Sequence, residues 1–393
     1  MVNNKIKEII QEQEKATIEM RRYLHAHPEQ SLLEFETTNY IAKQLDELAI
    51  PYRRMKSTGI IGEIKGASAG KTVLLRADID ALSINELNTV DYKSTNEGTM
   101  HACGHDSHIS MLMAALKALN EIKDQIKGTV RFVFQPAEEV AAGAKQAIEQ
   151  GVLDGVDNVF GMHIWTVDET GQVSCPVGPS FAACDQFTVK FTGKGGHAAQ
   201  PHMTNDALVI ASQYVVLLQD VVARRVDPMN AAVLTVGKIE SGDRFNIIAE
   251  TATLEGTVRT FDPNERDMIE GKIIKYAEHI AEMHDAVAEV EFNRLTDAVN
   301  NEAHSAKLVQ AVAREAFGDD SVQDNVATMG AEDFGFYMTQ VPGAFATVGA
   351  KNVEKETDFP HHSARFNIDE DALVRGAELY AQYALAYLKQ DEF

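Results

Sequence analysis

The chain has 393 residues, of which 45% are hydrophobic and 24% are charged, a composition typical of a soluble globular protein with about two domains. Its formal net charge of −23, from 36 basic and 59 acidic residues, repels phosphate backbones, so nucleic acid is not an expected partner. The amphipathic N-terminal segment lacks the apolar core of a secretory signal, and no run approaches the apolar length that spans a bilayer, so neither a signal nor a membrane segment is expected.

Helical and strand patterns alternate in the first part of the chain. Apolar residues recur near the helical period in residues 5–25 and 35–48, and further helices are expected at 109–122 and 141–150. Short continuous apolar runs predict buried strands at 71–80, 128–136 and 157–165. This alternation predicts an α/β domain whose parallel or mixed sheet is covered on both faces.

The rhythm changes in residues 184–292. Strands are expected at 185–193, 231–240, 249–261 and 286–295, with helices at about 205–224 and from Pro263, which Asp262 caps. This β-α-β-β-α-β order is the split-βαβ, or ferredoxin-like, motif and predicts a separate inserted domain. A helix at 306–317, a strand at 344–349 and a helix at 370–388 complete the first domain, which comprises residues 1–183 and 293–393.

The segment MHACGHDSH, residues 100–108, concentrates three histidines, a cysteine and an aspartate. Cys103 has two interpretations, a nucleophile with a histidine base beside it or a metal ligand. The chain has three cysteines and no CxxC pair, which fits a reducing compartment, and we expect a cytoplasmic location.

Other ligand-type residues follow the predicted strands. Glu138 and Glu139 come after one strand, His163 lies near the end of another, and His361 and His362 occupy a loop before the last helix. Each has an ordinary interpretation alone: a helix start that favours acidic residues, a satisfied core histidine, or surface loop histidines. Taken with Cys103 and His105, they supply the thiolate, imidazole and carboxylate ligands of zinc or a similar divalent ion. One glutamate and one histidine of these pairs would make five ligands, which suit two metals that share bridging groups.

With these residues the chain resembles a known family, the dinuclear metallo-amidohydrolases, which are a branch of the M20 metallopeptidases. This family includes aminoacylases, hippurate hydrolases, N-acetyldiaminopimelate deacetylases and auxin-conjugate hydrolases. The resemblance covers nearly the whole length, through the motifs RRYLHAHPEQS, RADIDAL, MHACGHDSH, FQPAEE, GMHIW, GKGGHAAQPH, GTVRTFD, GAEDF and HHSARF. It implies a zinc-peptidase-like α/β catalytic domain with a mixed sheet. It also implies that the inserted domain is a lid and a dimerisation domain.

The resemblance implies a role for each matching residue. It makes Glu138 the general base and Asp78 a carboxylate that orients a metal ligand, and it gives the metal ligands as Cys103, His105, Glu139, His163 and His362. An ion-paired aspartate near Arg76 is an equally good interpretation of Asp78. The wider clan has a histidine ligand at the position of Arg76, and which atoms bridge the metals is therefore left open.

The inserted domain would supply the substrate contacts. His197 resembles the family histidine that reaches a neighbouring subunit's site and stabilises the oxyanion, while Asn246 and Arg259 would hold the substrate's carboxylate. The alternatives without a functional role are a solvated turn histidine for His197 and a strand-edge surface charge for Arg259.

The function implied is hydrolysis of N-acyl-amino acids, with an acetyl, benzoyl or similar acyl group, to a carboxylic acid and a free amino acid. Two divalent ions per subunit, Zn or Mn with Co or Ni as alternatives, and a homodimer or higher homo-oligomer are expected. A dipeptidase or carboxypeptidase-like metallopeptidase is the alternative. A cysteine hydrolase that uses Cys103 ranks lower, since it leaves the glutamate pair, His163 and His362 without a use, and a non-catalytic metal- or peptide-binding protein is opposed by the intact Glu138.

Overall fold

The computed structural model of the chain describes residues 2–324 and 327–390 and divides into two compact units. Unit 1 comprises Met1–Ser180, Asn300–Val326 and Phe336–Phe393, and unit 2 comprises Phe181–Val299 and Ala327–Gly335. The main segment of unit 2 therefore runs over residues 181–299, where the sequence pattern gave 184–292. Residues 327–335, which the sequence pattern left in the first domain, cluster with unit 2.

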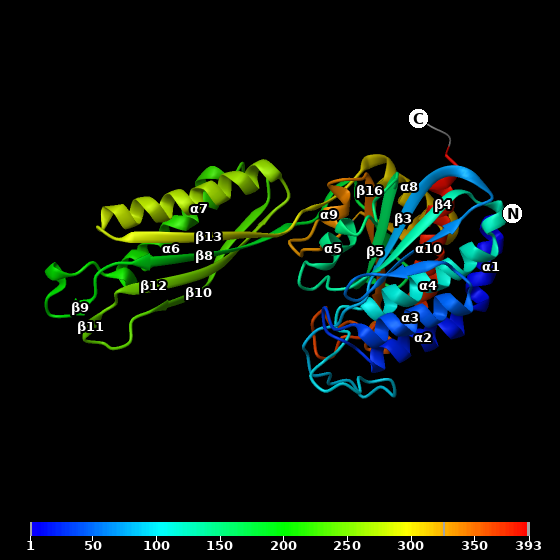
Figure 1. Ribbon diagram of the computed structural model, residues 1–393, viewed down its shortest axis with the longest axis horizontal. Helices are drawn as coiled ribbons and strands as arrows, with labels where there is room; N and C mark the ends of the chain where they lie inside the picture. Colours follow the sequence, from blue (N-terminus) through cyan, green and yellow to red (C-terminus); the bar gives the residue numbers. More distant parts are fainter. Residues whose placement is uncertain (1, 325–326, 391–393) are drawn as a thin grey trace. The chain divides into compact units, whose positions relative to one another are not determined.

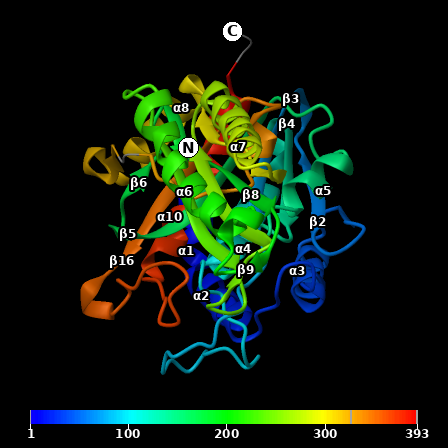
Figure 2. The same cartoon turned by 90° about the vertical axis from the view of Figure 1, so that its left-hand side faces the viewer.

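Unit 1 is built on an eight-stranded mixed sheet with the strand order β1-β2-β4-β3-β5-β16-β6-β15 (Figure 1). Its strands are β1 (Tyr52–Arg54), β2 (Ile60–Lys65), β3 (Ser68–Asp78), β4 (Lys127–Gln135), β5 (Asn158–Glu169), β6 (Val173–Ser174), β15 (Val322–Gln323) and β16 (Gly343–Lys351). The four central strands are parallel, and β16 runs beside β5 although most of unit 2 separates them in the sequence (Figure 2).

Helices flank this sheet, and they come from the parts of the sequence that precede and follow the main segment of unit 2. They are α1 (Val2–Glu12), α2 (Glu14–Ala26), α3 (Phe35–Glu47), α4 (His105–Glu121), α5 (Gly143–Glu149), α8 (Ala303–Phe317), α9 (Gly335–Met338) and α10 (Asp371–Leu388). All residues of β16 except the last are buried, as are the final six residues of β3. A strand that is apolar and buried on both faces belongs to a sheet with a layer on each side. The predicted α/β class with a mixed sheet is confirmed.

Several element boundaries differ from the sequence prediction. The helix predicted over 5–25 is two helices, because the amide of Gln13 donates to Ile10 three residues back and closes a tighter turn there. Helix α4 begins at His105, four residues before the predicted start, so this residue opens the helix and does not lie in a loop. Strand β5 runs to Glu169, which places His163 within the strand, not near its end. The edge strand β1 and its neighbour β2 were not predicted.

Unit 2 contains a four-stranded antiparallel sheet with the order β10-β12-β8-β13. Its elements are β8 (Ala183–Thr192), α6 (Ala207–Arg225), β10 (Ala232–Ser241), β12 (Thr251–Thr260), α7 (Pro263–Met283) and β13 (Val287–Thr296). Helix α7 begins as predicted, because the Asp262 side chain accepts hydrogen bonds from the amides of Asn264 and Glu265. This chain order and strand order are those of the split-βαβ motif.

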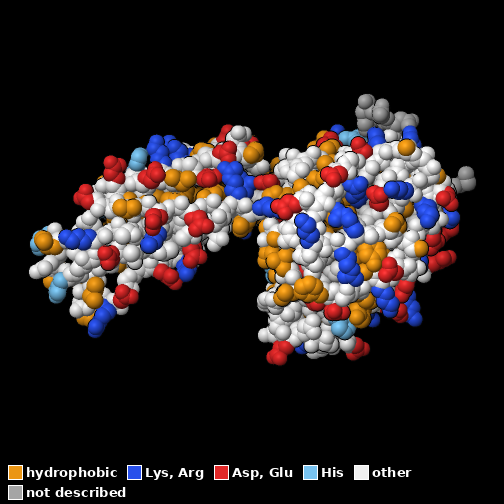
Figure 3. Space-filling view, in the orientation of Figure 1, with side chains coloured by type: hydrophobic (Ala, Val, Ile, Leu, Met, Phe, Trp, Pro, Cys, Tyr) orange, Lys and Arg blue, Asp and Glu red, His pale blue; other side chains and the backbone are white. Residues whose placement is uncertain are grey.

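Short paired strands complete the chain. Strand β9 (Gly196–His197) pairs with β11 (Ile247–Ile248), and β7 (Gly178–Phe181) pairs with β14 (Val299–Asn301). On the face drawn in Figure 3, acidic and basic side chains are interspersed over each unit, so the net negative charge is spread on that face and not gathered at one place.

By length and composition alone, α6 is apolar enough to cross a membrane, with a window of mean hydropathy 1.4. The sequence pattern gave no such segment. A third of that window is buried, and Ile210, Tyr214 and Leu218 belong to the core that α6 shares with α7 and the sheet of unit 2. Helices in the core of globular domains pass the same length and composition test, which makes this weak evidence of a membrane segment.

Candidate metal centre and active site

The ligand-type residues of unit 1 lie at the carboxyl ends of its parallel strands, or on the strands themselves. Asp78 is the last residue of β3, and the two glutamates follow the end of β4. His163 lies on β5, and His362 lies in the loop between β16 and α10. Strands β4 and β5 lie on opposite sides of β3, and ligands of open α/β sheets bind where the strand order reverses in this way.

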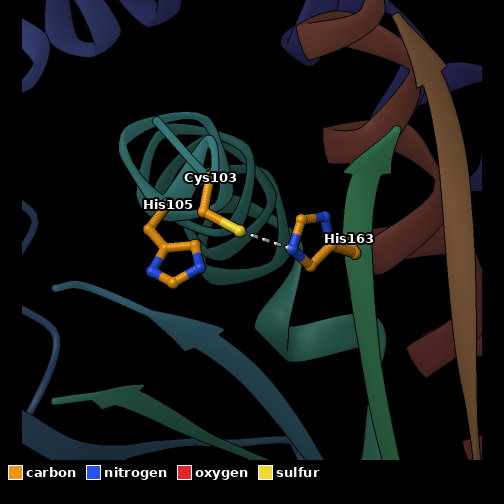
Figure 4. Close-up of side chains that lie close together, drawn as sticks. All are labelled: Cys103, His105 and His163. Carbon is orange, nitrogen blue, oxygen red and sulfur yellow. Dashed lines mark hydrogen bonds between the residues drawn. The ribbon is translucent and has the colours of Figure 1, made fainter. Parts of the chain in front are cut away.

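Three side chains form the buried floor of the site (Figure 4). The ligand atoms of Cys103, His105 and His163 all lie within 4.8 Å of one another, and all three residues are buried. The sulfur of Cys103 lies 3.4 Å from Nε2 of His163. A cysteine sulfur and two imidazoles at this spacing form a donor set for zinc and similar ions.

Gly104 turns the backbone within MHACGHDSH, between Cys103 and His105. Its φ of 89° lies in the left-handed region, and a Cβ added here would lie 2.3 Å from a methyl carbon of Ile164. Only glycine fits this backbone and this close approach to β5. Because of this turn, Cys103 lies just before α4 and His105 is the first residue of α4.

Backbone hydrogen bonds fix the orientation of both imidazoles. Nδ1 of His163 lies 2.6 Å from the carbonyl oxygen of Ile164, and Nδ1 of His105 lies 2.9 Å from the carbonyl oxygen of Asp80. A carbonyl accepts only, so each Nδ1 carries the proton and donates it. Each Nε2 is therefore the nitrogen left to bind a metal ion, as a metal-binding imidazole requires.

Glu139 connects this floor to His362. Its Oε1 lies 3.9 Å from Nε2 of His105 and 3.7 Å from Nε2 of His362. Glu139 belongs to one possible metal-binding group with Cys103 and His362, and to another with His105 and Glu138. A carboxylate shared by two such groups is suited to a pair of ions.

Two buried atoms of the site have no hydrogen-bond partner among the described residues, namely Nε2 of His105 and Oε1 of Glu139. A buried polar atom left without a partner costs about 1–3 kcal/mol. The ligand atoms of His105 and Glu139 lie within 4.8 Å of one another, so a divalent cation held by this group would satisfy them. The residues present therefore fit a metal centre.

The electrostatics of the site oppose a cysteine nucleophile. Burial, together with the charges of Glu139 and Glu138, raises the pKa of Cys103 well above its usual value. Burial and the neighbouring His108 lower the pKa of His163 well below its usual value. The pair is thus a neutral thiol and a neutral imidazole, whereas a nucleophilic cysteine needs a lowered thiol pKa.

His105 has the opposite shift. Burial alone would lower its pKa, but Asp78, Asp80 and Glu139 raise it to about 10. The concentration of negative charge around this ring favours a cation at its position, either a proton or a metal ion.

Asp78 contacts a residue that the sequence analysis did not assign. Its Oδ1 lies 2.5 Å from Nδ1 of His108, and its Oδ2 pairs with Arg76 and lies 3.7 Å from Nε2 of His105. Burial would raise the pKa of Asp78, but Arg76 and the two histidines hold it well below its usual value. Arg76, at the position of the wider clan's histidine ligand, therefore keeps this carboxylate ionised.

His108 has no nitrogen left for a metal. While Nδ1 donates to Asp78, Nε2 accepts a hydrogen bond of 2.8 Å from the amide of Ile164, the residue after His163. His108 therefore ties the end of β3 to the strand that carries a ligand. The spacing of His105 and His108, three apart on one helix, is the sequence signal for this placement.

The two histidines of HHSARF differ in burial. His361 stacks on Trp165 with ring centroids 4.8 Å apart, and burial beside other histidines lowers its pKa to about 3. The side chain of His362 is 55% exposed. Its φ of 63° turns the backbone at this point, and its amide donates to the carbonyl of Ala102. This turn lets His361 pack in the interior while His362 reaches Glu139.

The expected residues of unit 2 lie at two places. His197 is exposed on β9 and pairs with Ile247, and the carbonyl of Asn246 accepts a hydrogen bond from Ala198, so His197 and Asn246 are neighbours. Arg259 lies near the end of β12, eight residue steps or roughly 26 Å along the strand from Thr251. One small carboxylate therefore does not contact both Asn246 and Arg259 of the same unit 2.

Arg259 retains an unsatisfied donor. Its Nη1 is buried and has no hydrogen-bond partner among the described residues. This guanidinium therefore keeps an unused donor of the kind that a carboxylate accepts.

Comparison with known proteins places the chain in a family. The model of peptidase family M20/M25/M40 matches residues 74–386. N-acetyl-L-cysteine deacetylase of Bacillus subtilis is 40% identical over 390 residues, which cover 96% of this chain and 90% of that protein. Thermostable carboxypeptidase 2 of Saccharolobus solfataricus is 36% identical over 387 residues, which cover 98% of each.

A solved structure is similar throughout. The YXEP protein of Bacillus subtilis, described as a dinuclear metal-binding peptidase of the M20 family, superposes with a TM-score of 0.84 and 34% identity. The match covers 96% of this chain and 98% of that one. With a family model that spans most of the sequence and relatives similar over nearly their full length, the chain belongs to peptidase family M20/M25/M40.

Proposed function

We propose that the chain is a metal-dependent amidohydrolase that cleaves N-acyl-amino acids to a carboxylic acid and a free amino acid. The observation that carries the proposal is the set of ligand-type side chains around buried, unpartnered atoms of His105 and Glu139. The chain's similarity to an N-acetyl-L-cysteine deacetylase supports an N-acyl-amino acid as the substrate, with acetyl as the first choice of acyl group.

The metal ligands we propose are Cys103, His105, Glu139, His163 and His362, for two divalent ions, with Zn or Mn preferred to Co or Ni. Such ions, when bound, polarise a carbonyl and lower the pKa of water. The chain's contribution is to hold the ligand atoms in place, through Gly104, the backbone acceptors of the two imidazoles and the shared Glu139.

Glu138 is the proposed general base. It occupies the same turn as Glu139, and its carboxylate lies within 4.8 Å of the ligand atoms of His105 and Glu139. From this position it takes a proton from the attacking water and later donates one to the leaving amine. Asp78 acts through His108, which it orients toward the strand of His163.

Unit 2 supplies the remaining roles as a lid. Arg259 binds the substrate's carboxylate, while His197 and Asn246, which lie together, act as a pair in which His197 stabilises the oxyanion in a neighbouring subunit's site. This assignment includes a homodimer formed through unit 2. The exposed apolar side chains of Leu208, Val209 and Val216 on α6 support an interface there. The cytoplasm stays the predicted location.

Peptides are the second candidate substrates, favoured by the similarity to a carboxypeptidase. An N-acyl-amino acid and a dipeptide both carry an amide bond next to a free carboxylate. Parallel assays of N-acetyl-amino acids, benzoyl-amino acids and dipeptides, followed by release of the free amino acid, rank these substrates directly.

Glu138→Gln tests the proposed mechanism. We expect kcat to fall by about 10²–10⁴-fold, because the amide cannot transfer the proton, while the bound metal measured by mass spectrometry is unchanged. The control is Glu149→Gln, which changes an exposed carboxylate at the end of the following helix α5. Near-normal turnover by Glu138→Gln would show that the general base lies elsewhere.

A further inference from the structure

The turn that carries the two glutamates is held by carboxylates of other segments. The amide of Ala137 donates to Oε1 of Glu34 at 2.9 Å. The next two amides, of Glu138 and Glu139, donate to Oδ1 and Oδ2 of Asp80, each at 3.1 Å. Glu34 and Asp80 are both buried. Three consecutive amides of the turn are thus fixed from outside by two side chains.

The backbone of this turn needs such support. Ala137 and Ala141 both have a φ of 54°, in the left-handed region that alanine avoids at a cost of roughly 1–2 kcal/mol each. Backbone of this kind persists where the surrounding structure restrains it. The hydrogen bonds to Glu34 and Asp80 begin at the first of these two residues and supply that restraint.

Asp80 also holds a second part of the site. Its backbone carbonyl accepts the hydrogen bond from Nδ1 of His105, and its Oδ1 lies 3.3 Å from the same nitrogen. Ser31 donates to Oδ2 at 2.6 Å and holds the carboxylate in this orientation. One residue therefore connects the imidazole at the start of α4 with the glutamate turn after β4.

We propose that Asp80 is a positioning residue that sets Glu138 and Glu139 relative to His105, and that it does so through its two carboxylate oxygens and not through its charge. The inference rests on the proposed function for the roles of Glu138 and Glu139, but its geometry does not depend on which amide is cleaved.

Glu34 provides a matched comparison, because glutamine, an amide of the same shape, can keep the hydrogen bonds of this side chain. Among the described residues, its Oε1 accepts from the amides of Ala137 and Leu32, and its Oε2 accepts from the hydroxyl of Thr58 alone. A glutamine keeps the single oxygen on the two amides and places its NH2 on the hydroxyl, which can also accept. Burial raises the pKa of Glu34, which lessens the cost of losing its charge.

Asp80 does not allow this exchange. Both of its oxygens accept from backbone amides, and asparagine offers one oxygen and one NH2 group. In Asp80→Asn, an NH2 group therefore faces the N–H of either Glu138 or Glu139. The two variants remove one buried negative charge each, but only one of them loses an acceptor for the turn.

The test compares full-length Asp80→Asn and Glu34→Gln with the wild type. Affinity of the metal-free protein for Mn²⁺ is measured by calorimetry, kcat and KM are measured for hydrolysis, and hydrogen exchange is followed in residues 137–142. For Asp80→Asn we expect a loss of about 10–100-fold in Mn²⁺ affinity or kcat, an unchanged KM and faster exchange in the turn. For Glu34→Gln we expect wild-type behaviour in all three measurements.

Two outcomes overturn the proposal. One is wild-type behaviour of Asp80→Asn, and the other is an equal loss in both variants, which would assign the effect to charge. If Asp80→Asn does not fold, Ser31→Ala replaces it, and unchanged exchange in the turn then counts against the proposal. Absence of amide hydrolysis by the wild type would refute the proposed function, while Mn²⁺ affinity and exchange would still decide the role of Asp80.

Discussion

Replacement of Gly104 by alanine tests the geometry of the metal centre most directly. Gly104 lies between two proposed ligands, with a φ of 89°, and the added Cβ would lie 2.3 Å from a methyl carbon of Ile164. Ile164 is buried on β5 next to His163, so the clash is relieved only if the MHACGHDSH segment or the ligand strand moves. Gly104→Ala is therefore expected both to destabilise the protein and to weaken metal binding.

Two costs add in this variant. The left-handed backbone costs alanine about 1–2 kcal/mol, and overpacking of the core costs about 1–3 kcal/mol. The lower entropy of the unfolded chain returns about 0.4–1 kcal/mol. The sum is a loss of roughly 1–5 kcal/mol in the free energy of unfolding.

Gly178→Ala separates the two costs. Gly178 has the same φ of 89°, and nothing lies within 4 Å of the added Cβ, so only the backbone cost remains. Urea unfolding of the metal-free variants should show Gly104→Ala less stable than Gly178→Ala by about 1–3 kcal/mol, the overpacking cost. Calorimetry should show weaker Mn²⁺ binding in Gly104→Ala alone. Equal stability of the two variants would refute the assigned contact with Ile164.

Two further predictions concern metal removal and pH. Chelation with EDTA should abolish hydrolysis, and added Mn²⁺, Co²⁺ or Zn²⁺ should restore it, since the ligand set serves cations; activity indifferent to chelator would favour the cysteine hydrolase. Burial would raise the pKa of Glu302, but hydrogen bonds from the amides of His304 and Ser305 lower this pKa. The ionised carboxylate therefore stabilises α8 fully above the unfolded-state pKa of about 4.3. This contribution is lost as the pH falls through the lower folded-state pKa. The difference in urea midpoint between the wild type and Glu302→Gln should therefore be larger at pH 7 than at pH 3.5, and a constant difference would contradict the assignment.

The metal-binding part of the site could be anticipated because its residues follow a regular pattern. Parallel strands end at one edge of a sheet, so the glutamates after β4 and the aspartate ending β3 meet there, whatever their distance in sequence. The split-βαβ motif was equally visible, because its strands alternate between buried and exposed residues.

The supporting contacts could not be anticipated, because they depend on tertiary packing. Asp80 and Glu34 are ordinary acidic residues in the sequence, and nothing local shows that their oxygens meet three amides of a distant turn. The separation of Asn246 from Arg259 follows from the length of β12 and from the pairing of β9 with β11, which single-sequence patterns do not give. The edge strand β1 has only three residues and is largely exposed, so it carries little apolar signal.

The position of β16 has a consequence for the order in which the chain acquires its structure during synthesis. Strand β5 pairs with β3 on one side and with β16 on the other, and β16 leaves the ribosome only after residues 181–299 have been made. Domains fold largely as units, from the N-terminus, as the chain emerges. Unit 2 can therefore form its own core while one edge of β5 is still unpaired, and such an edge invites pairing with other chains. Nascent chains that stall after β5 has emerged and before β16 has been made leave this edge exposed.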